Sequence, residues 1–156
     1  MKSLCVLVVL ASACTKPDDV PALHDEAHAT VAHVTEELDH LDDQFKALKN
    51  RGEQLKVYYP GSDEAGMLVT ITFKETQALR HELDGAEQRI KAATTPDELR
   101  ARIDAYEDVA EHGAPATKEH PPIPGIPALG SALTTVESWL THTEAVKAAG
   151  SAMLPP

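Results

Sequence analysis

The sequence has few cysteines, few aromatic residues and few basic residues. Its 156 residues include two Cys, 4% aromatic residues, and 14 Lys and Arg against 25 Asp and Glu. Nucleic-acid affinity comes largely from Lys and Arg that neutralise phosphates, so a net charge of −11 excludes nucleic acid as a partner. The 42% content of hydrophobic residues is ordinary for a globular protein. The length is enough for one compact domain.

Long apolar runs are also scarce, and the clearest one lies at the start of the chain. The run from Leu4 to Leu10 is too short to span a bilayer, which requires roughly 20 apolar residues. It follows Met1-Lys2 and precedes the small residues Ala11-Ser12-Ala13, which is the order of a secretory signal peptide. We therefore expect residues 1–13 to be removed during export.

The residues around Cys14 carry a resemblance to a known class of signal. Leu10-Ala11-Ser12-Ala13-Cys14 resembles the lipobox of bacterial lipoproteins, although the family usually has Leu where this chain has Ala11. The resemblance implies that Cys14 is acylated, becomes the first mature residue and anchors the protein in a membrane through a tether of residues 14–19. Thr15 follows the cysteine where an inner-membrane retention signal has Asp, which implies the periplasmic face of the outer membrane. Ala11-x-Ala13 also suits ordinary signal peptidase, so secretion to the periplasm is the alternative.

Cleavage at this point determines which cysteine the mature chain retains. Cys5 leaves with the signal peptide, so the mature chain has Cys14 alone and can form no internal disulfide. An envelope protein of this size can omit disulfides only if its hydrophobic core is sufficient by itself.

Apolar residues recur at alternating spacings of three and four over the first part of the mature chain. This heptad pattern predicts one long helix between residues 20 and 59 that packs along a single seam. The seam consists of Ala27, Val31, Val34, Leu38, Leu41, Phe45, Leu48, Leu55 and Tyr59. Such a helix, about 60 Å long at 1.5 Å per residue, must be covered. We expect partner helices of the same chain to cover it, and a homodimeric coiled coil is the alternative.

The next segment allows two interpretations. A second helix is expected to start near Gly61-Ser62 and to bury Leu79, Leu83, Ala86 and Ile90 on one face. Between Met67 and Phe73, however, the apolar residues point in all directions on a helical wheel, whereas alternate residues would share one face of a strand. We expect a helix, because the first seam runs on through residues 55 and 59. The alternative is a mainly α fold with a β-hairpin insert near 55–73.

Two further helices are expected, separated by a proline-rich loop. Thr95-Pro96-Asp97-Glu98 is typical of a helix start, with Thr95 as N-cap and Glu98 placed to reach back to the cap amide. That helix should end at Gly113 and bury Leu99, Ile103, Tyr106 and Ala110. Five prolines then predict an extended crossover loop over 113–128, which at about 3.1 Å per residue is long enough to cross the bundle. A last helix over 131–149 should carry Leu133, Val136, Leu140 and Val146 on one face, before a frayed tail at 151–156.

These elements together predict an all-α fold. We expect a single helical domain over residues 20–150, in the form of an elongated bundle with a long heptad-patterned first helix.

Histidines supply the main candidates for metal ligands. His33, Glu37 and His40 share one face of the predicted first helix, where helical spacing allows them to share a Zn, Cu or Ni ion. Glu37-x-x-His40 resembles the Glu-x-x-His element of di-iron carboxylate bundles, but those proteins need two such elements and this chain has one. At about 100° per residue the three side chains lie roughly 100° from the apolar seam, which favours a solvated flank.

The sequence lacks the patterns of common catalytic sites. It contains no Gly-x-Ser-x-Gly, no glycine-rich phosphate loop and no recognisable Ser, His and acid spacing, so we expect neither an enzyme nor a cofactor. We expect a lipid-anchored helical binding or scaffolding protein of the bacterial cell envelope, with the membrane and an envelope protein as partners. The alternative is a periplasmic metal-buffering protein that uses the histidine-rich first helix.

Overall fold

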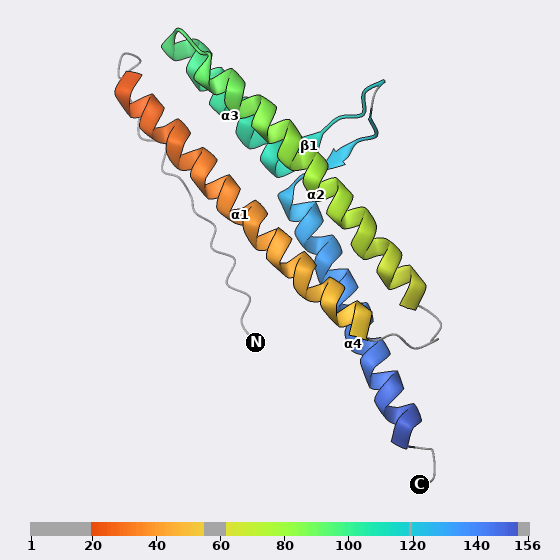
Figure 1. Ribbon diagram of the computed structural model, residues 1–156. Coiled ribbons are helices and arrows are strands. Elements are labelled where there is room, and N and C mark those ends of the chain that lie inside the picture. Colours follow the sequence, from red (N-terminus) through yellow and green to blue (C-terminus); the bar gives the residue numbers. More distant parts are fainter. Residues whose placement is uncertain (1–19, 55–61, 119, 153–156) are drawn as a thin grey trace.

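The structure is a computed structural model that describes residues 20–54, 62–118 and 120–152. The expected signal peptide, Cys14, the tether, the seam residues Leu55 and Tyr59, and residues 153–156 lie outside this part. The described residues form four helices and one two-stranded hairpin (Figure 1). In chain order these are α1 (Val20–Gln54), α2 (Ser62–Lys91), α3 (Pro96–His112), β1 (Gly113–Ala114), β2 (Ile123–Pro124) and α4 (Ile126–Ala152). The predicted all-α bundle is confirmed.

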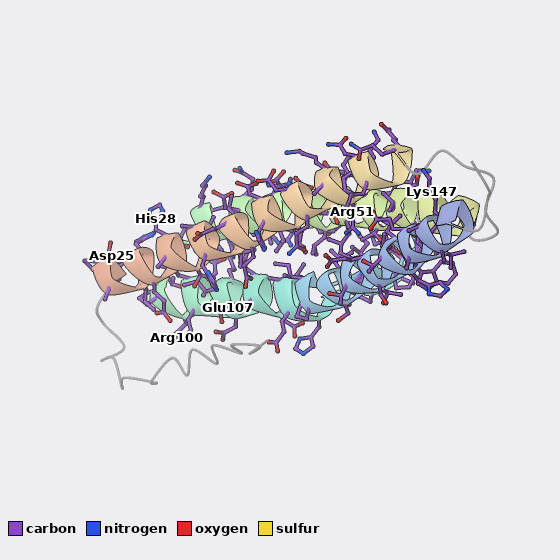
Figure 2. The ribbon with its side chains drawn as sticks, turned by 90° about the horizontal axis from the view of Figure 1, so that it is seen from below. Asp25, His28, Arg51, Arg100, Glu107 and Lys147 are labelled. Carbon is purple, nitrogen blue, oxygen red and sulfur yellow. The ribbon has the colours of Figure 1, made fainter. Side chains whose placement is uncertain are left out.

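The four helices form an elongated bundle that is three helices wide in cross-section, because α3 and α4 together make up the third helical layer beside α1 and α2. α1 and α2 run antiparallel, and α3 and α4 follow one another end to end in the direction of α1 (Figures 1 and 2). Thr30 of α1 donates a hydrogen bond of 3.1 Å to Glu107 of α3. Arg51, near the other end of α1, donates one of 2.8 Å to Glu144 of α4. The first half of α1 therefore packs on α3 and the second half on α4.

The heptad seam of α1 is buried inside the chain. The buried residues of α1 are Leu23, Ala27, Val34, Leu38, Leu41 and Leu48, with Val31 and Phe45 partly buried against them. All three other helices contact α1, so the seam is covered within the monomer and is not free to form a dimeric coiled coil. The seam also begins one turn earlier than the sequence pattern indicated, at Leu23.

α2 is continuous through the segment for which two interpretations were open. Met67 to Phe73 lie within α2, so the alternative of strands is wrong for these residues. The expected face of Leu79, Leu83, Ala86 and Ile90 is buried, and it continues toward the helix start through Val69, Thr72 and Thr76. The two threonines fit this face because each hydroxyl donates to the carbonyl four residues earlier, at 2.9 and 2.8 Å. Because two residues of this buried face are polar, the apolar spacing alone did not show that the face continues to the start of α2.

The start of α3 forms much as its sequence predicts. Thr95 is the N-cap, and its side chain accepts a hydrogen bond from the backbone N–H of Glu98. The Glu98 carboxylate reaches back one residue further than expected, because it accepts from the backbone N–H of Thr94 at 2.9 Å. That hydrogen bond holds the pKa of Glu98 below its usual value.

The expected crossover loop over 113–128 is wrong, because the chain folds back on itself. Gly113 adopts φ 85°, a conformation that L side chains rarely adopt, and the chain returns so that Gly113 pairs with Pro124 and Ala114 with Ile123. The loop between β1 and β2 projects from the side of the bundle (Figure 1). Ile123 is buried against the bundle. After the hairpin the chain continues from the place where α3 ended and does not cross the bundle.

α4 begins earlier than expected, at Ile126. Pro127 does not prevent this, because proline is tolerated in the first turn of a helix, where the N–H has no partner. Leu129, which the sequence pattern placed next to the loop, is consequently a fully buried core residue. Val146 was expected on the buried face but is 44% exposed. The C-terminal end of α4 extends past the ends of α1 and α2 (Figure 1). Val146 lies in the last two turns of α4, and its exposure shows that the core does not cover it.

Candidate functional site

The structure does not assemble the predicted metal site. His33 Nε2 and Glu37 Oε1 are 3.8 Å apart on α1, and their side chains are 69% and 46% exposed. His40 instead lies 3.0 Å from the side-chain nitrogen of Gln44. Within the described residues, no three His, Cys, Asp or Glu side chains lie together in a way that could hold a metal ion. The three candidates occupy the solvated flank of α1 that their angular position predicted.

The other histidines are also at the surface or in pairs. His24 and His28 are exposed on the first turns of α1, and His81 is exposed on α2. His112 Nδ1 lies 2.9 Å from Asp108 near the C-terminus of α3, where a cation is favoured. His120, in the hairpin loop, lies 3.7 Å from Glu82 of α2. These pairs connect neighbouring turns or hold the hairpin against α2, and each supplies at most two ligands.

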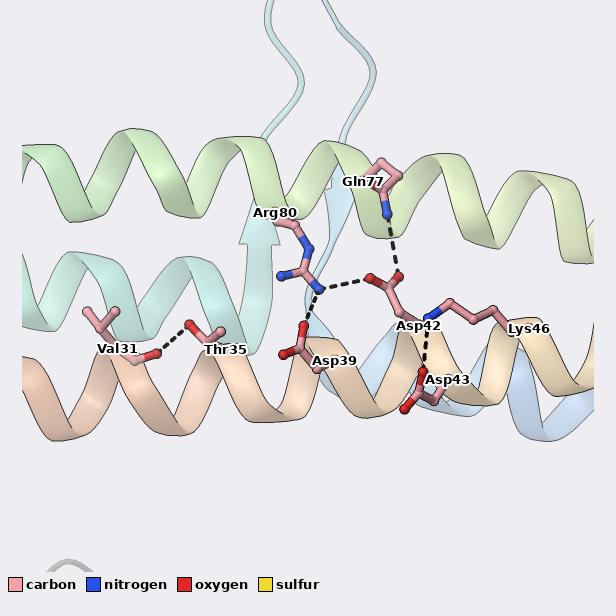
Figure 3. Close-up of polar contacts among 8 residues, drawn as sticks. All are labelled: Val31, Thr35, Asp39, Asp42, Asp43, Lys46, Gln77 and Arg80. Atoms are coloured by element: carbon pink, nitrogen blue, oxygen red, sulfur yellow. Dashed lines mark hydrogen bonds and ion pairs between the residues drawn. The ribbon is translucent and has the colours of Figure 1, made fainter.

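The best-developed polar cluster joins α1 to α2 (Figure 3). One guanidinium nitrogen of Arg80 donates to both Asp39 and Asp42, at 2.9 Å each, while Gln77 reaches Asp42 at 3.4 Å. Burial lowers the pKa of Arg80, but the hydrogen bonds and charges of the two aspartates outweigh this and raise it. Lys46 pairs separately with Asp43 at 3.0 Å. The cluster fixes the register of two helices, and each of its carboxylates lies against a cation, although Asp39 and Asp42 share the single charge of Arg80.

A second cluster joins α1 to α4. Arg51 donates to both carboxylate oxygens of Glu144, at 3.2 and 2.8 Å, and to the Thr141 hydroxyl at 3.2 Å. Glu137 lies 3.7 Å from the same guanidinium. The hydrogen bond from Arg51 lowers the pKa of Glu144. No local sequence signal marks Arg51, because its partners lie more than eighty residues away in the chain.

Tyr106 is the buried ionisable group of α3. The residue is 2% exposed. Burial is the main cause that raises the pKa of Tyr106, to about 12, and the negative charges of Glu87 and Asp84 contribute to the same shift. The phenol therefore keeps its proton near neutral pH and belongs to the core.

Large apolar side chains remain exposed at one end of the bundle. Met67, Leu68 and Ile71 of α2 are 64%, 36% and 44% exposed, and Trp139 and Val146 of α4 are 42% and 44% exposed. We call these five residues the apolar patch. Phe73 differs from them, because its ring stacks on Phe45 of α1 with the ring centroids 4.5 Å apart. The segment from Met67 to Phe73 has apolar residues on all sides, and the α2 part of the patch consists of those that the bundle does not cover.

None of the helices in the described ranges is long and apolar enough to cross a membrane. Comparison with known proteins gives no match to any family model, curated protein or solved structure. Functional conclusions therefore rest on the chain's own residues.

Proposed function

We propose that this chain is a lipid-anchored, non-catalytic binding or scaffolding protein of the bacterial cell envelope. The observation that carries the proposal is Cys14, which follows an apolar run and small residues in the arrangement of a lipobox. The cysteine stands six residues before α1, which begins at Val20. Fully extended, six residues span at most about 20 Å, so acylation holds the first turn of α1 close to the membrane surface.

The surface of the bundle supports a binding role. Charged side chains cover α1 and α3, whose labelled residues Asp25, His28, Arg100 and Glu107 lie together at one end of the bundle (Figure 2). Many of the charges are held in pairs within or between helices, as in the Arg80 and Arg51 clusters. An elongated bundle whose surface charges are largely held in ion pairs, and which exposes one apolar patch, is suited to holding a partner.

The two cysteines of the chain provide a matched test. Cys14→Ser should abolish incorporation of labelled palmitate and move the protein from the detergent phase to the aqueous phase in Triton X-114 partitioning. Cys5→Ser removes the other thiol, within the expected signal peptide, and should change neither result. If the unmutated protein incorporates no palmitate, lipid anchoring is refuted and export without an anchor replaces it.

The scaffolding part of the proposal needs a separate measurement. Cross-linking in intact cells, followed by purification of the tagged protein, should recover at least one defined complex of higher mass. Recovery of the protein in uncross-linked form alone, at cross-linker doses that capture a known envelope complex in the same cells, would contradict a scaffolding role.

A further inference from the structure

The two halves of the apolar patch lie at the same level of the bundle. His120 lies 3.7 Å from Glu82, so the hairpin places the start of α4 near the level of Glu82 on α2. From there α4 runs antiparallel to α2 (Figure 1). Trp139 follows Ile126 by thirteen residues, about 20 Å along the axis. The same rise counted back along α2 from Glu82 reaches Val69, next to Leu68.

Both halves also face the same side. On α2, Arg80 contacts α1, and Ile71 lies about 180° around the helix from it at 100° per residue. On α4, Glu137 lies near Arg51 of α1, and Trp139 lies about 160° around the helix from Glu137. The exposed residues of each helix therefore lie on the flank turned away from α1, on either side of the contact between α2 and α4.

The outer face of α4 differs from the rest of the surface in charge. Charged residues make up 8 of the 17 residues of α3 and 11 of the 35 of α1, but only 3 of the 27 of α4. Two of these three, Glu137 and Glu144, face Arg51. From Ser138 to Ala149, the exposed residues other than Trp139 and Val146 are Ser, Thr, Ala and His142, and the third charge, on Lys147, is positive and half-buried. On a chain with a net charge of −11, this is a face that a second acidic molecule can approach without like-charge repulsion.

We propose that two copies of this chain associate through the apolar patch and the adjoining uncharged face of α4. A two-fold axis near Trp139 brings the same patch of each copy together and leaves the acidic surfaces of α1 and α3 apart. The proposal rests on the scaffolding function above and names its partner, a second copy of the chain. Its experiments use unacylated protein, so a failure of lipid anchoring does not affect them.

The size of the surface sets the expected strength. α4 is about 40 Å long at 1.5 Å per residue, and with the flank of α2 it offers a strip about 15 Å wide. This strip buries about 600 Å² per copy, below the roughly 800 Å² of a standard interface. The dimer should therefore be weak, with a Kd of micromolar order or above. A membrane is a poorer occupant, because a helix that lies in a bilayer interface needs a broad apolar face, whereas Ser, Thr and Ala fill most of this one.

Sedimentation equilibrium of the complete chain carrying Cys14→Ser tests the proposal. We expect a reversible monomer–dimer equilibrium. Trp139→Glu should raise the Kd about a hundredfold, because a symmetric interface brings two new carboxylates together. Val20→Glu adds the same charge at the far end of the bundle, at a residue that is 38% exposed, and should leave the Kd within about twofold. Circular dichroism of each variant establishes that it is folded. A chain that is monomeric up to about 1 mM, or a dimer equally weakened by both variants, overturns the proposal.

Site-specific cross-linking locates the interface independently. In a chain whose Cys5 and Cys14 are both Ser, Trp139→Cys should form a disulfide-linked dimer under mild oxidation, at a rate that falls on dilution. Val20→Cys should cross-link at least tenfold more slowly. Equal rates at the two positions overturn the proposed face. Binding of the Cys14→Ser protein to phosphatidylethanolamine and phosphatidylglycerol vesicles that is lost in Trp139→Glu, without self-association in solution, assigns the face to a membrane and overturns it too.

Discussion

Substituting Gly113 by Ala should destabilise the protein more than a change of one methyl group normally does. Gly113 has φ 85° and ψ −166°, a region that is essentially restricted to glycine and costs other residues about 1–3 kcal/mol. A Cβ atom at this position would lie 1.9 Å from the carbonyl oxygen of Ile123 and 2.7 Å from the backbone nitrogen of Gly125. Both neighbours are backbone atoms, so neither can move aside without separating β1 from β2.

The expected cost follows from these two effects. Relief of the overlap disrupts the pairing of Gly113 with Pro124, and each lost backbone hydrogen bond adds about 1 kcal/mol. Together with the backbone strain, we expect Gly113→Ala to lower the free energy of unfolding by about 2–4 kcal/mol, out of a total of about 5–15 kcal/mol for a typical domain. At an m-value of about 2 kcal/mol/M, the urea midpoint falls by about 1–2 M.

Gly130→Ala is the matched control, with the opposite expected sign. Gly130 lies within α4, and a Cβ there would lie 3.9 Å from a methyl group of Leu41, an ordinary contact. Alanine is favoured over glycine in a helix interior by about 1 kcal/mol, so the urea midpoint should rise. If the two variants shift the midpoint in the same direction, the hairpin does not constrain the junction of α3 and α4 in the way described.

Three further predictions concern ionisable groups. Tyr106 keeps its proton in the folded state up to a pKa of about 12, whereas the unfolded phenol releases it near pH 10. This contribution to stability is complete below pH 10 and is lost as the pH rises toward 12, at about 1.4 kcal/mol per pH unit. Urea midpoints measured across this range should show the loss, and Tyr106→Phe should remove it. The hydrogen bond from Arg51 lowers the pKa of Glu144 below 4.5. Its contribution is present above pH 4.5 and lost as the pH falls through the folded pKa, so Glu144→Gln should flatten the acid limb of the stability profile, and an unchanged limb would contradict the pairing. Calorimetric titration with Zn should give equally weak heats for the unmutated protein and for His33→Ala combined with His40→Ala. Tight binding that the double substitution abolishes would instead support metal buffering.

The sequence was most informative where one helix face could be followed by periodicity alone. The seam of α1 and the faces of α3 and α2 were predicted from apolar spacing, and Thr95 was placed as a cap from its neighbours, because these signals act within a few turns of one helix. Apolar spacing did not identify Thr72 and Thr76 as part of the buried face of α2, because both residues are polar. A threonine in a helix can satisfy its hydroxyl on the preceding turn and enter the core, and this outcome depends on the space that α1 and α4 leave.

The path of the chain after α3 could not be obtained from local signals. The prolines before Gly125 correctly indicated a non-helical segment, whereas Pro127 lies in the first turn of α4. They do not specify the direction of the chain, and its return depends on Gly113 fitting against the backbone of β2 and on Gly125 fitting against the backbone of Glu111 at the end of α3. The contacts of the candidate site could likewise be predicted only within one helix. Helical spacing placed His33 and Glu37 on one flank, and the structure keeps them within 3.8 Å. The partners of Arg51, and the uncharged side of the bundle formed by α4, arise only when distant helices meet.

The end-to-end arrangement of α3 and α4 makes the hairpin removable in principle. Replacing residues 113–125 by one alanine places Leu129 seven residues after Ala110, one full heptad further along the same face. The following core residues Leu133, Val136 and Leu140 then keep the spacing of four, three and four that α3 already has. Pro127 must also become Ala, because it would now lie in a helix interior, where proline costs about 3 kcal/mol. The hairpin thus interrupts a heptad pattern that is otherwise continuous from α3 to α4, and removing it should leave a three-helix bundle whose core lacks only Ile123.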